Sequence, residues 1–370
     1  MARAKEPRQI SIAERTAPAF PRLEVLTAPA DGGNPYQRLL ADALARRGAT
    51  VVAANRLRLR DVLGARRRAC IVHLHWIEFI IRSTDSGRWR GLLSVGRAVH
   101  LLLVLLVARI RRVRVVWTVH NLQPHEARRK RLDALATWLV ARLADAVLVH
   151  SRHCAAKVSE RWGRTVEVAY HGNYIDFYPP PRRDRRESRL SLGIPADAHV
   201  FLAFGLIRPY KMIVELIAEF RRLADPRFRL LIAGRPLSDD LRRQVEAAAA
   251  GDERVVLRLG RIADADVAEI HLAADVAVFA YRDVFSSGAL MLALSHGLPV
   301  VAAEDSTASE LGAPPAIRGF PAGGLGDALL ASFPSGAAAR ERALGTAARY
   351  DWEAMATKVL GGGESLVGSP

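Results

Sequence analysis

Three small residues, Ser286, Ser287 and Gly288, lie between two segments of opposite character. The apolar run from Asp275 to Tyr281 is typical of a buried strand, and the segment from Ala289 to Ser295 has a helical pattern. The first turn of a helix carries unpaired N–H groups and a partial positive charge, and small residues let an anion approach. The pattern therefore predicts a phosphate-binding turn, although a simple helix N-cap would look the same.

The charge of the chain is compatible with a phosphate-bearing ligand. The 370 residues have a formal net charge of +16, which would suit nucleic acid, an anionic membrane or a phosphorylated substrate, although a high-GC genome also enriches arginine. Zinc-finger spacing and RNA-binding aromatic motifs are absent from the sequence, so we expect no nucleic-acid partner. The two cysteines lack metal-ligand spacing and indicate a reducing compartment. Residues 1–20 are predicted to form a basic tail without a signal peptide.

Residues 21–178 alternate between strand and helix patterns. Six apolar runs are predicted to be strands: Leu23 to Ala28, Thr50 to Ala53, Ile71 to Leu74, Val113 to Val119, Ala146 to His150 and Val166 to Tyr170. Helical patterns separate most of them, which is typical of a parallel sheet covered by helices on both faces. Ligands of such sheets bind at the carboxyl ends of the strands.

A proline-rich segment, Pro179 to Arg186, divides the chain, and we assign residues 179–192 to a linker. The alternation of strands and helices then restarts over residues 193–345. Residues 346–362 are predicted to contain a final helix led by Tyr350, Asp351 and Trp352. The fold class is therefore α/β, with two Rossmann-like parallel-sheet domains and a cleft between them.

Taken in order, these segments resemble the GT-B glycosyltransferases. The segments LLIAGRP, LGRIADADVAEIHLAADVAVFAY and LSHGLPVVA are similar to successive parts of the nucleotide-sugar domain of that family, and DWEAMATKVL is similar to its returning C-terminal helix. The resemblance covers most of residues 23–360. It implies a GT-B fold in which two Rossmann-like domains face each other across the cleft, with residues 21–178 on the acceptor side.

The same resemblance implies a donor site in the second domain. FGLIRPYK is similar to the FxGRxxxxKG segment in which an arginine and a lysine hold the donor diphosphate, and it places Arg208 and Lys211 in these roles. Backbone near the donor is expected at Gly234 and, beside the nucleobase, at Arg261 and Ile262. Charge on the leaving diphosphate must be stabilised, and these cations with the Ser286, Ser287 and Gly288 turn would do so. We expect no metal ion and no cofactor beyond the nucleotide sugar.

One departure concerns stereochemistry. The retaining branch of this fold carries an E-x7-E pair, and alignment of LMLALSHGLPVV puts Val284 and Leu292 at the two positions, with Asp283 only adjacent. The sequence is closer to inverting β-mannosyltransferases of bacterial exopolysaccharide assembly, such as the xanthan type. The GGNPY and TVHNLQPHE segments also resemble those enzymes.

An inverting transfer needs a general base near the acceptor hydroxyl. The strand-end loops of the first domain offer acidic and imidazole candidates: Asp31, His75, Glu78, His120, His125 and Glu126. By resemblance, His120 is the histidine that meets the donor sugar. The choice of base among Asp31, Glu78 and Glu126 stays open, and Glu126 would also suit a helix start.

The segment from Trp89 to Arg114 is strongly apolar, and Arg90, Arg97 and Arg111 are separated by multiples of seven residues, which puts them on one helical face. Its unbroken apolar run, Leu101 to Ala108, is shorter than the ~20 residues of a membrane span. The segment is interpreted either as an interfacial helix on an anionic membrane or as an ordinary helix packed on the sheet. In the first case, serine at Leu102 and Leu105 should weaken membrane binding without aggregation.

The leading hypothesis is an enzyme at the cytoplasmic face of the cell membrane. It transfers a sugar, with GDP-mannose as the candidate, from a GDP- or UDP-linked donor to a lipid-linked or oligosaccharide acceptor, with inversion. A retaining GT-B glycosyltransferase with another donor is the first alternative. A catalytically inactive GT-B subunit that supports a partner is the alternative from another class, and the diphosphate-binding pair Arg208 and Lys211 argues against it.

Overall fold

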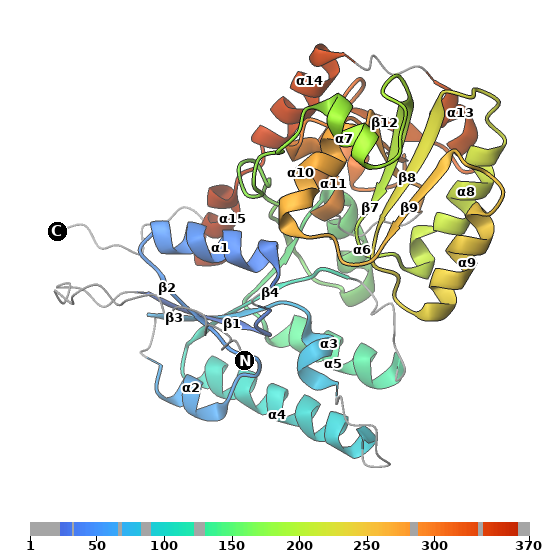
Figure 1. Cartoon of the computed structure of the whole chain (residues 1–370). Coiled ribbons are helices and arrows are strands. Elements are labelled where there is room, and N and C mark those ends of the chain that lie inside the picture. Colours follow the sequence, from blue (N-terminus) through green and yellow to red (C-terminus); the bar gives the residue numbers. More distant parts are fainter. Residues whose placement is uncertain are drawn as a thin grey trace, which may run out of the picture.

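Two parallel sheets organise the chain, and they lie in separate halves of the molecule (Figure 1). The computed structural model describes residues 23–31, 33–65, 69–82, 90–121, 130–281, 288–331 and 336–361. Both sheets have six strands within this part of the chain, and every strand pair is parallel. The prediction of two α/β units with parallel sheets is confirmed.

The first sheet has the strand order β2-β1-β3-β4-β5-β6. Its strands are β1 (Glu24–Ala28), β2 (Thr50–Ala53), β3 (Cys70–Leu74), β4 (Arg114–Thr118), β5 (Ala146–Val149) and β6 (Glu167–Val168). The helices of this half are α1 (Pro35–Arg46), α2 (Leu59–Leu63), α3 (Ile77–Ile81), α4 (Arg90–Ile110), α5 (Lys130–Leu143) and α6 (Arg152–Trp162). All six predicted strands are present, with ends shifted by up to two residues.

The second sheet has the strand order β12-β11-β10-β7-β8-β9. Its strands are β7 (His199–Phe204), β8 (Phe228–Gly234), β9 (Val255–Leu259), β10 (Val276–Phe279), β11 (Val300–Ala303) and β12 (Ile317–Phe320). The helices are α7 (Arg185–Ser191), the 3-10 turn η1 (Pro209–Lys211), α8 (Ile213–Arg221), α9 (Asp239–Ala249), α10 (Asp264–Ala273), α11 (Gly288–Ser295), α12 (Ala308–Leu311), α13 (Leu325–Leu330), α14 (Ala337–Ala348) and α15 (Trp352–Leu360).

Part of the predicted linker is folded. Asp184 caps α7 by accepting from the Glu187 N–H at 2.8 Å, and the Glu187 carboxylate accepts from the Asp184 N–H in return. The Arg189 guanidinium of the same helix pairs with the buried carboxylate of Asp275 at 2.7 Å. The run of charge after the prolines therefore attaches this helix to the second sheet instead of forming a free connection.

The first helix shows how local sequence sets the entry to the cleft. Asn34 caps α1 by accepting from the Tyr36 N–H at 3.0 Å, and Pro35 occupies the first helical turn. The buried face of α1 consists of Tyr36, Leu40, Ala43 and Leu44. The cap thus places Tyr36 at the start of a helix whose apolar face turns toward the core.

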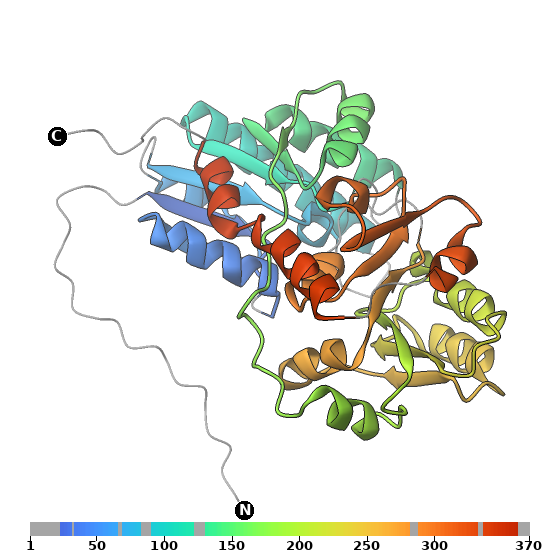
Figure 2. The ribbon, with the colours of Figure 1, turned by 90° about the horizontal axis from the view of Figure 1, so that it is seen from above.

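The C-terminal helix α15 returns to the first half of the molecule and lies beside α1 (Figures 1 and 2). The Tyr36 hydroxyl donates to Met355 Sδ at 3.4 Å, and the Glu353 carboxylate pairs with Arg46 and Arg47 at 2.7 and 2.9 Å. The indole N–H of Trp352 donates to the Asn173 carbonyl at 2.6 Å. Apolar burial and polar contacts together join the two halves here.

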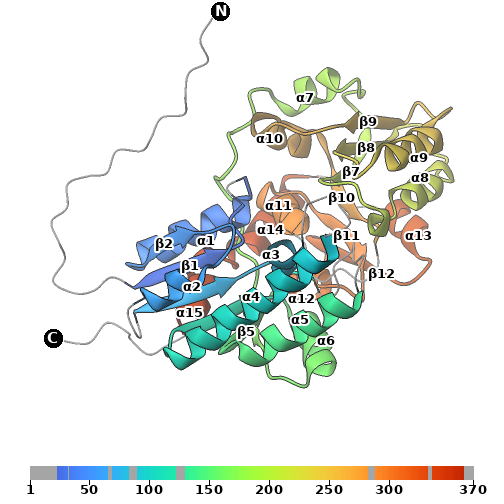
Figure 3. The same cartoon turned by 90° about the horizontal axis from the view of Figure 1, so that it is seen from below.

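A long helix, α4, covers an outer face of the first sheet beside α2 and α5 (Figure 3). One of its faces is buried in the core through Ala98, Leu101, Val104, Leu105 and Ala108. The opposite face exposes large apolar side chains, here called the α4 stripe: Leu92, Val95, Val99, Leu103, Leu106 and Ile110. Leu92 and Ile110 are 67% and 70% exposed.

The structure corrects two expectations for α4. The helix spans 21 residues, and Gly91–Ile110 is long and apolar enough to cross a membrane by length and composition alone, so the estimate from the short run Leu101 to Ala108 was wrong. The buried face shows that α4 is packed as a helix of this fold. Leu105 is fully buried, so its replacement by serine would test the core and not a membrane surface.

Candidate active site

A cavity of about 490 Å³ lies between the two halves, at the carboxyl ends of both sheets. Segments that follow β1, β3, β4 and β6 line it from the first half, and segments that follow β7 and β8 line it from the second. The start of α11 completes the wall. This is the location at which parallel α/β sheets bind ligands, so the cavity is the candidate active site.

Arg208 and Lys211 both line this cavity from η1 and the residue before it. Burial, and then the neighbouring Arg208 charge, lower the pKa of Lys211 to about 8. An anion bound between two neighbouring cations stabilises both charges, and guanidinium and ammonium groups donate hydrogen bonds to phosphate oxygens. The predicted diphosphate pair is therefore placed together, on the second-domain side of the cavity.

Gly288 is the first residue of α11 and also lines the cavity. A β-carbon built on Gly288 would lie 3.0 Å from Tyr174 Oη and 3.2 Å from His171 Nε2. Glycine therefore lets the α11 N-terminus approach the opposite half of the molecule. The companion residues Ser286 and Ser287, together with Val284 and Asp283, lie outside the described residues, while Leu292 is buried in the core.

The remaining predicted donor residues do not line the cavity. Gly234 ends β8 with a φ of +155°, and a β-carbon there would lie 1.8 Å from the Gly205 carbonyl oxygen, so its glycine is required by close packing of two strand ends. Arg261 is exposed after β9, and Ile262 packs against the core. Their assignment to the nucleobase stays a prediction from resemblance.

Glu78 is the carboxylate that the first half presents to the cavity among the described residues. Burial raises the pKa of Glu78, and this outweighs the Arg82 charge and the hydrogen bond with Asn121, which lower it. A carboxylate with a raised pKa is a better proton acceptor at neutral pH than an ordinary one. Of the carboxylate candidates that the structure describes, Glu78 is the one that lines the cavity, and its role as a general base stays a prediction.

Asp31 has a different position. It is exposed in the turn before α1, outside the cavity lining, and its Oδ1 accepts from the Gly33 N–H at 3.2 Å. This contact stabilises the turn, and Asp31, unlike Glu78, does not line the cavity. His125 and Glu126 lie outside the described residues, so their predicted roles receive no structural account.

His120 follows β4 and lines the cavity, and its contact with the donor sugar stays a prediction from resemblance. Its Nε2 lies 3.1 Å from His75 Nδ1, and its ring stacks on Trp76 with centroids 4.2 Å apart. Burial, followed by the charges of neighbouring histidines, lowers the pKa of His120 well below its usual value. A neutral imidazole at this site can donate or accept a hydrogen bond to a sugar hydroxyl.

Sequence reasoning missed an aromatic cluster behind this wall. Four imidazole rings pack around the buried Tyr36 ring at centroid distances of 4.8 to 5.6 Å: His75, His120, His150 and His171. Each histidine lies just after the end of β3, β4, β5 or β6. A histidine at four successive strand ends was the available signal, because those ends meet at one edge of a parallel sheet.

Other residues of the cavity wall were also not predicted. They follow strand ends or begin helices and supply aromatic and polar groups: Trp76, Phe79, Arg82, Asn121, Tyr174 and Tyr210. Among the described residues, no three His, Cys, Asp or Glu side chains are grouped so as to hold a metal ion. The cavity thus combines Arg208 and Lys211 on the side of the second half with Arg82, a carboxylate, imidazoles and aromatic rings on the side of the first half.

Comparison with known proteins agrees with this geometry. Residues 198–314 match the family model described as "Glycosyl transferases group 1". A GDP-mannose:glycolipid 4-β-D-mannosyltransferase of Xanthomonas campestris pv. campestris is 31% identical over 299 residues, which cover 77% of this chain and 75% of that protein. A D-inositol 3-phosphate glycosyltransferase of Kineococcus radiotolerans is 30% identical over 231 residues, covering 46% of this chain and 52% of that protein.

Solved structures show the same fold. The Anabaena protein HepE in complex with UDP-glucose superposes with a TM-score of 0.64 at 17% identity, covering 91% of this chain and 98% of that chain. The sucrose-phosphate synthase of Thermosynechococcus elongatus gives 0.63 at 19% identity, covering 90% and 96%. The two-sheet architecture, the cleft and the similarity to the Xanthomonas enzyme lead to one conclusion: the chain belongs to the group 1 glycosyltransferases of the GT-B fold.

Proposed function

We propose that this glycosyltransferase transfers mannose from GDP-mannose to a glycolipid acceptor with inversion, which gives a β-linked product. The observation that carries the proposal is the similarity to the Xanthomonas enzyme, whose name specifies this donor, acceptor class and linkage. The absence of a glutamate at Leu292 supports inversion, because that position is apolar and buried here.

In the proposed reaction, Arg208 and Lys211 bind the diphosphate and stabilise the charge that develops as the bond from the sugar to the diphosphate breaks. The N-terminus of α11 adds backbone donors beside Gly288. Because these groups supply positive charge from the protein itself, the proposed mechanism contains no metal ion and no cofactor.

Glu78 acts as the general base from the opposite wall of the cavity. It removes the proton of the acceptor hydroxyl as that oxygen attacks the anomeric carbon. The diphosphate leaves toward Arg208 and Lys211, and the attack comes from the first-domain side, where Glu78 lies. Attack and departure on opposite faces of the sugar invert the anomeric configuration. His120 hydrogen-bonds to the donor sugar in its neutral form.

The α4 stripe supports a location at the inner face of the cell membrane. Six large apolar side chains lie on one exposed helix face, and burying them in a lipid–water interface is more favourable than leaving them in water. The positive net charge favours anionic lipids. In this proposal the first domain rests on the membrane, so that the glycolipid acceptor reaches the cavity from that side.

The proposal is tested by incubating the purified protein with GDP-mannose, UDP-glucose and UDP-galactose and with extracted glycolipids. We expect transfer from GDP-mannose and a β anomeric signal in the proton NMR spectrum of the product. Transfer from a UDP-linked donor would replace the donor assignment. An α-linked product from the α-linked donor would favour the retaining alternative, with Asp283 as the first residue to examine.

A further inference from the structure

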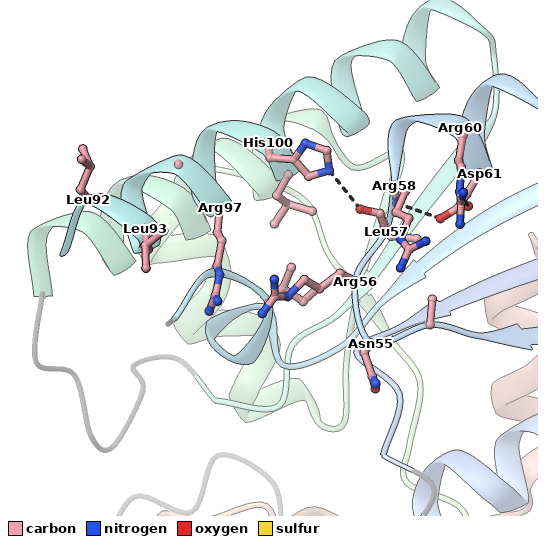
Figure 4. A pocket seen from close by; sticks show the side chains of 14 residues that line it. Asn55, Arg56, Leu57, Arg58, Arg60, Asp61, Leu92, Leu93, Arg97 and His100 are labelled. Carbon is pink, nitrogen blue, oxygen red and sulfur yellow. Dashed lines mark hydrogen bonds and ion pairs between the residues drawn. The ribbon is translucent and has the colours of Figure 1, made fainter. Parts of the chain in front are cut away.

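A second, larger cavity of about 970 Å³ lies in the first half of the molecule (Figure 4). It opens between the loop that follows β2, the helix α2 and the first turns of α4. This cavity, here called the arginine pocket, is lined in part by Arg56, Arg58, Arg60, Arg97 and His100. Since the loop follows the carboxyl end of β2, the pocket is on the same edge of the sheet as the active site.

Among the described residues that line the arginine pocket, cationic side chains outnumber anionic ones. Asp61 carries the negative charge among its described lining residues, and its oxygens accept from the Arg58 backbone N–H at 2.8 Å and pair with Arg60 at 3.8 Å. The Arg97 guanidinium lines the pocket and donates to the Arg82 carbonyl at 2.6 Å. Figure 4 shows Arg56 and Arg97 extending into the same space from opposite sides. Guanidinium groups around one cavity favour a phosphate or diphosphate between them.

The arginine pocket lies next to the active-site cavity. A single short helix, α3, separates the two: Ile80 lines the arginine pocket, while Glu78 and Phe79 line the active-site cavity. The pocket is also lined by Leu92 and Leu93 of α4, and Leu92 is the first residue of the α4 stripe. A ligand with its phosphate in the pocket would have an apolar surface on one side and the catalytic cavity on the other.

A glycolipid in which phosphate joins a lipid to a glycan has these three parts in this order. We propose that the arginine pocket binds the phosphate or diphosphate of a lipid-linked acceptor, with the lipid along the α4 stripe and the glycan reaching over α3 to Glu78. The inference rests on the glycolipid acceptor of the proposed function and assigns its anionic part to residues outside the catalytic cavity.

The test is vesicle flotation with the full-length protein. Phosphatidylcholine vesicles that contain a polyprenyl diphosphate are compared with vesicles that contain phosphatidylglycerol at the same surface charge. We expect the wild type to bind the diphosphate vesicles about tenfold more tightly, and the variant Arg56→Gln/Arg58→Gln to lose this preference. Both side chains are exposed, so the variant should fold, which circular dichroism checks. Arg243→Gln, on an exposed site of α9, is the matched control and should keep the preference.

Equal binding of the wild type to both vesicles would overturn the proposal, as would an unchanged preference in the double variant. Binding of inorganic pyrophosphate that the double variant loses, without a vesicle preference, would assign the pocket to a soluble anion and also overturn it. GDP-mannose turnover is measured separately. If the protein does not turn over GDP-mannose but still prefers the diphosphate vesicles, the proposed donor is wrong and the assignment of the arginine pocket stands.

Discussion

Gly288 and Tyr174 meet across the active-site cavity, so that a β-carbon on the glycine would lie 3.0 Å from the tyrosine hydroxyl oxygen. A methyl group at this point is a tighter contact than most, so the Tyr174 side chain, the His171 ring or α11 must shift to accommodate it. Gly288→Ala should therefore lower kcat/KM by about tenfold or more, the cost of overpacking a close contact. In the double variant Gly288→Ala/Tyr174→Phe the hydroxyl is gone, and part of the activity should return. If Gly288→Ala has the same kcat/KM as the wild type, the close contact between the start of α11 and Tyr174 is not needed for activity.

The donor site is tested by removing its two cations. Arg208→Ala and Lys211→Ala should each reduce kcat/KM by about 2–4 kcal/mol in transition-state terms, because charge on the leaving diphosphate is no longer stabilised. Arg235→Ala, an exposed arginine after β8 that does not line the cavity, is the control and should retain activity. Full turnover by the first two variants would remove the assignment.

Glu78→Gln should reduce kcat by about 100-fold or more, because the acceptor hydroxyl loses its base. In the wild type the rate should rise with pH as Glu78 ionises, at a pH above that of an ordinary glutamate, since burial raises its pKa. The folded state also holds this proton more tightly, so the stability contributed by the group is present at low pH and is lost as pH rises through the folded-state pKa. Glu78→Gln should thus melt no lower than the wild type at neutral pH. If Glu78→Gln is both less active and markedly less stable than the wild type, the residue has a structural role instead.

Lys211 should set the upper limit of the pH profile. Its pKa of about 8 means that the free enzyme loses this charge in mildly alkaline solution, so kcat/KM for the donor should fall above about pH 8. Lys211→Arg keeps the charge at higher pH, and its profile should extend upward. An unchanged alkaline limb in Lys211→Arg would assign the limb to another group.

The α4 stripe gives a matched pair of membrane variants. Leu103→Ser/Leu106→Ser changes two exposed residues and should weaken co-sedimentation with anionic vesicles while the protein stays soluble. Leu105→Ser changes a fully buried neighbour and should destabilise the fold by about 2–5 kcal/mol, as large-to-small core changes do. If the first variant sediments as the wild type does, the stripe is not the membrane surface.

The fold could be predicted from the sequence because strands such as Val255–Leu259 are short apolar runs between clear turns. Arg208 and Lys211 could be placed because a local motif carries both. Two elements that the sequence did not reveal are β12 and α3. The β12 segment is IRGF, in which Arg318 and Gly319 interrupt the apolar run, and α3 has five residues, too few for a periodic pattern. Glu78 on α3 was one of several candidates for the base, and the sequence alone could not show that it lines the cavity while Asp31 does not.

Contacts between distant strands explain the rest. His75 and His120 are 45 residues apart, and only the order of β3 and β4 in the sheet brings their rings within hydrogen-bond distance. The faces of α4 posed a related problem. Leu105 and Leu106 have the same apolar character in the sequence, but the packing direction of the helix buries one and exposes the other.

The return of α15 to α1 has a consequence for the order in which the molecule is completed during synthesis. Tyr36 and Met355 are 319 residues apart, so the part of α1 that packs on α15 stays uncovered until nearly all of both domains has been translated. The first domain thus emerges from the ribosome early but gains its last helix after the second domain. Completion of the acceptor side therefore depends on successful synthesis of the donor side, and a nascent chain that stops early leaves α1 open to chaperones and proteases.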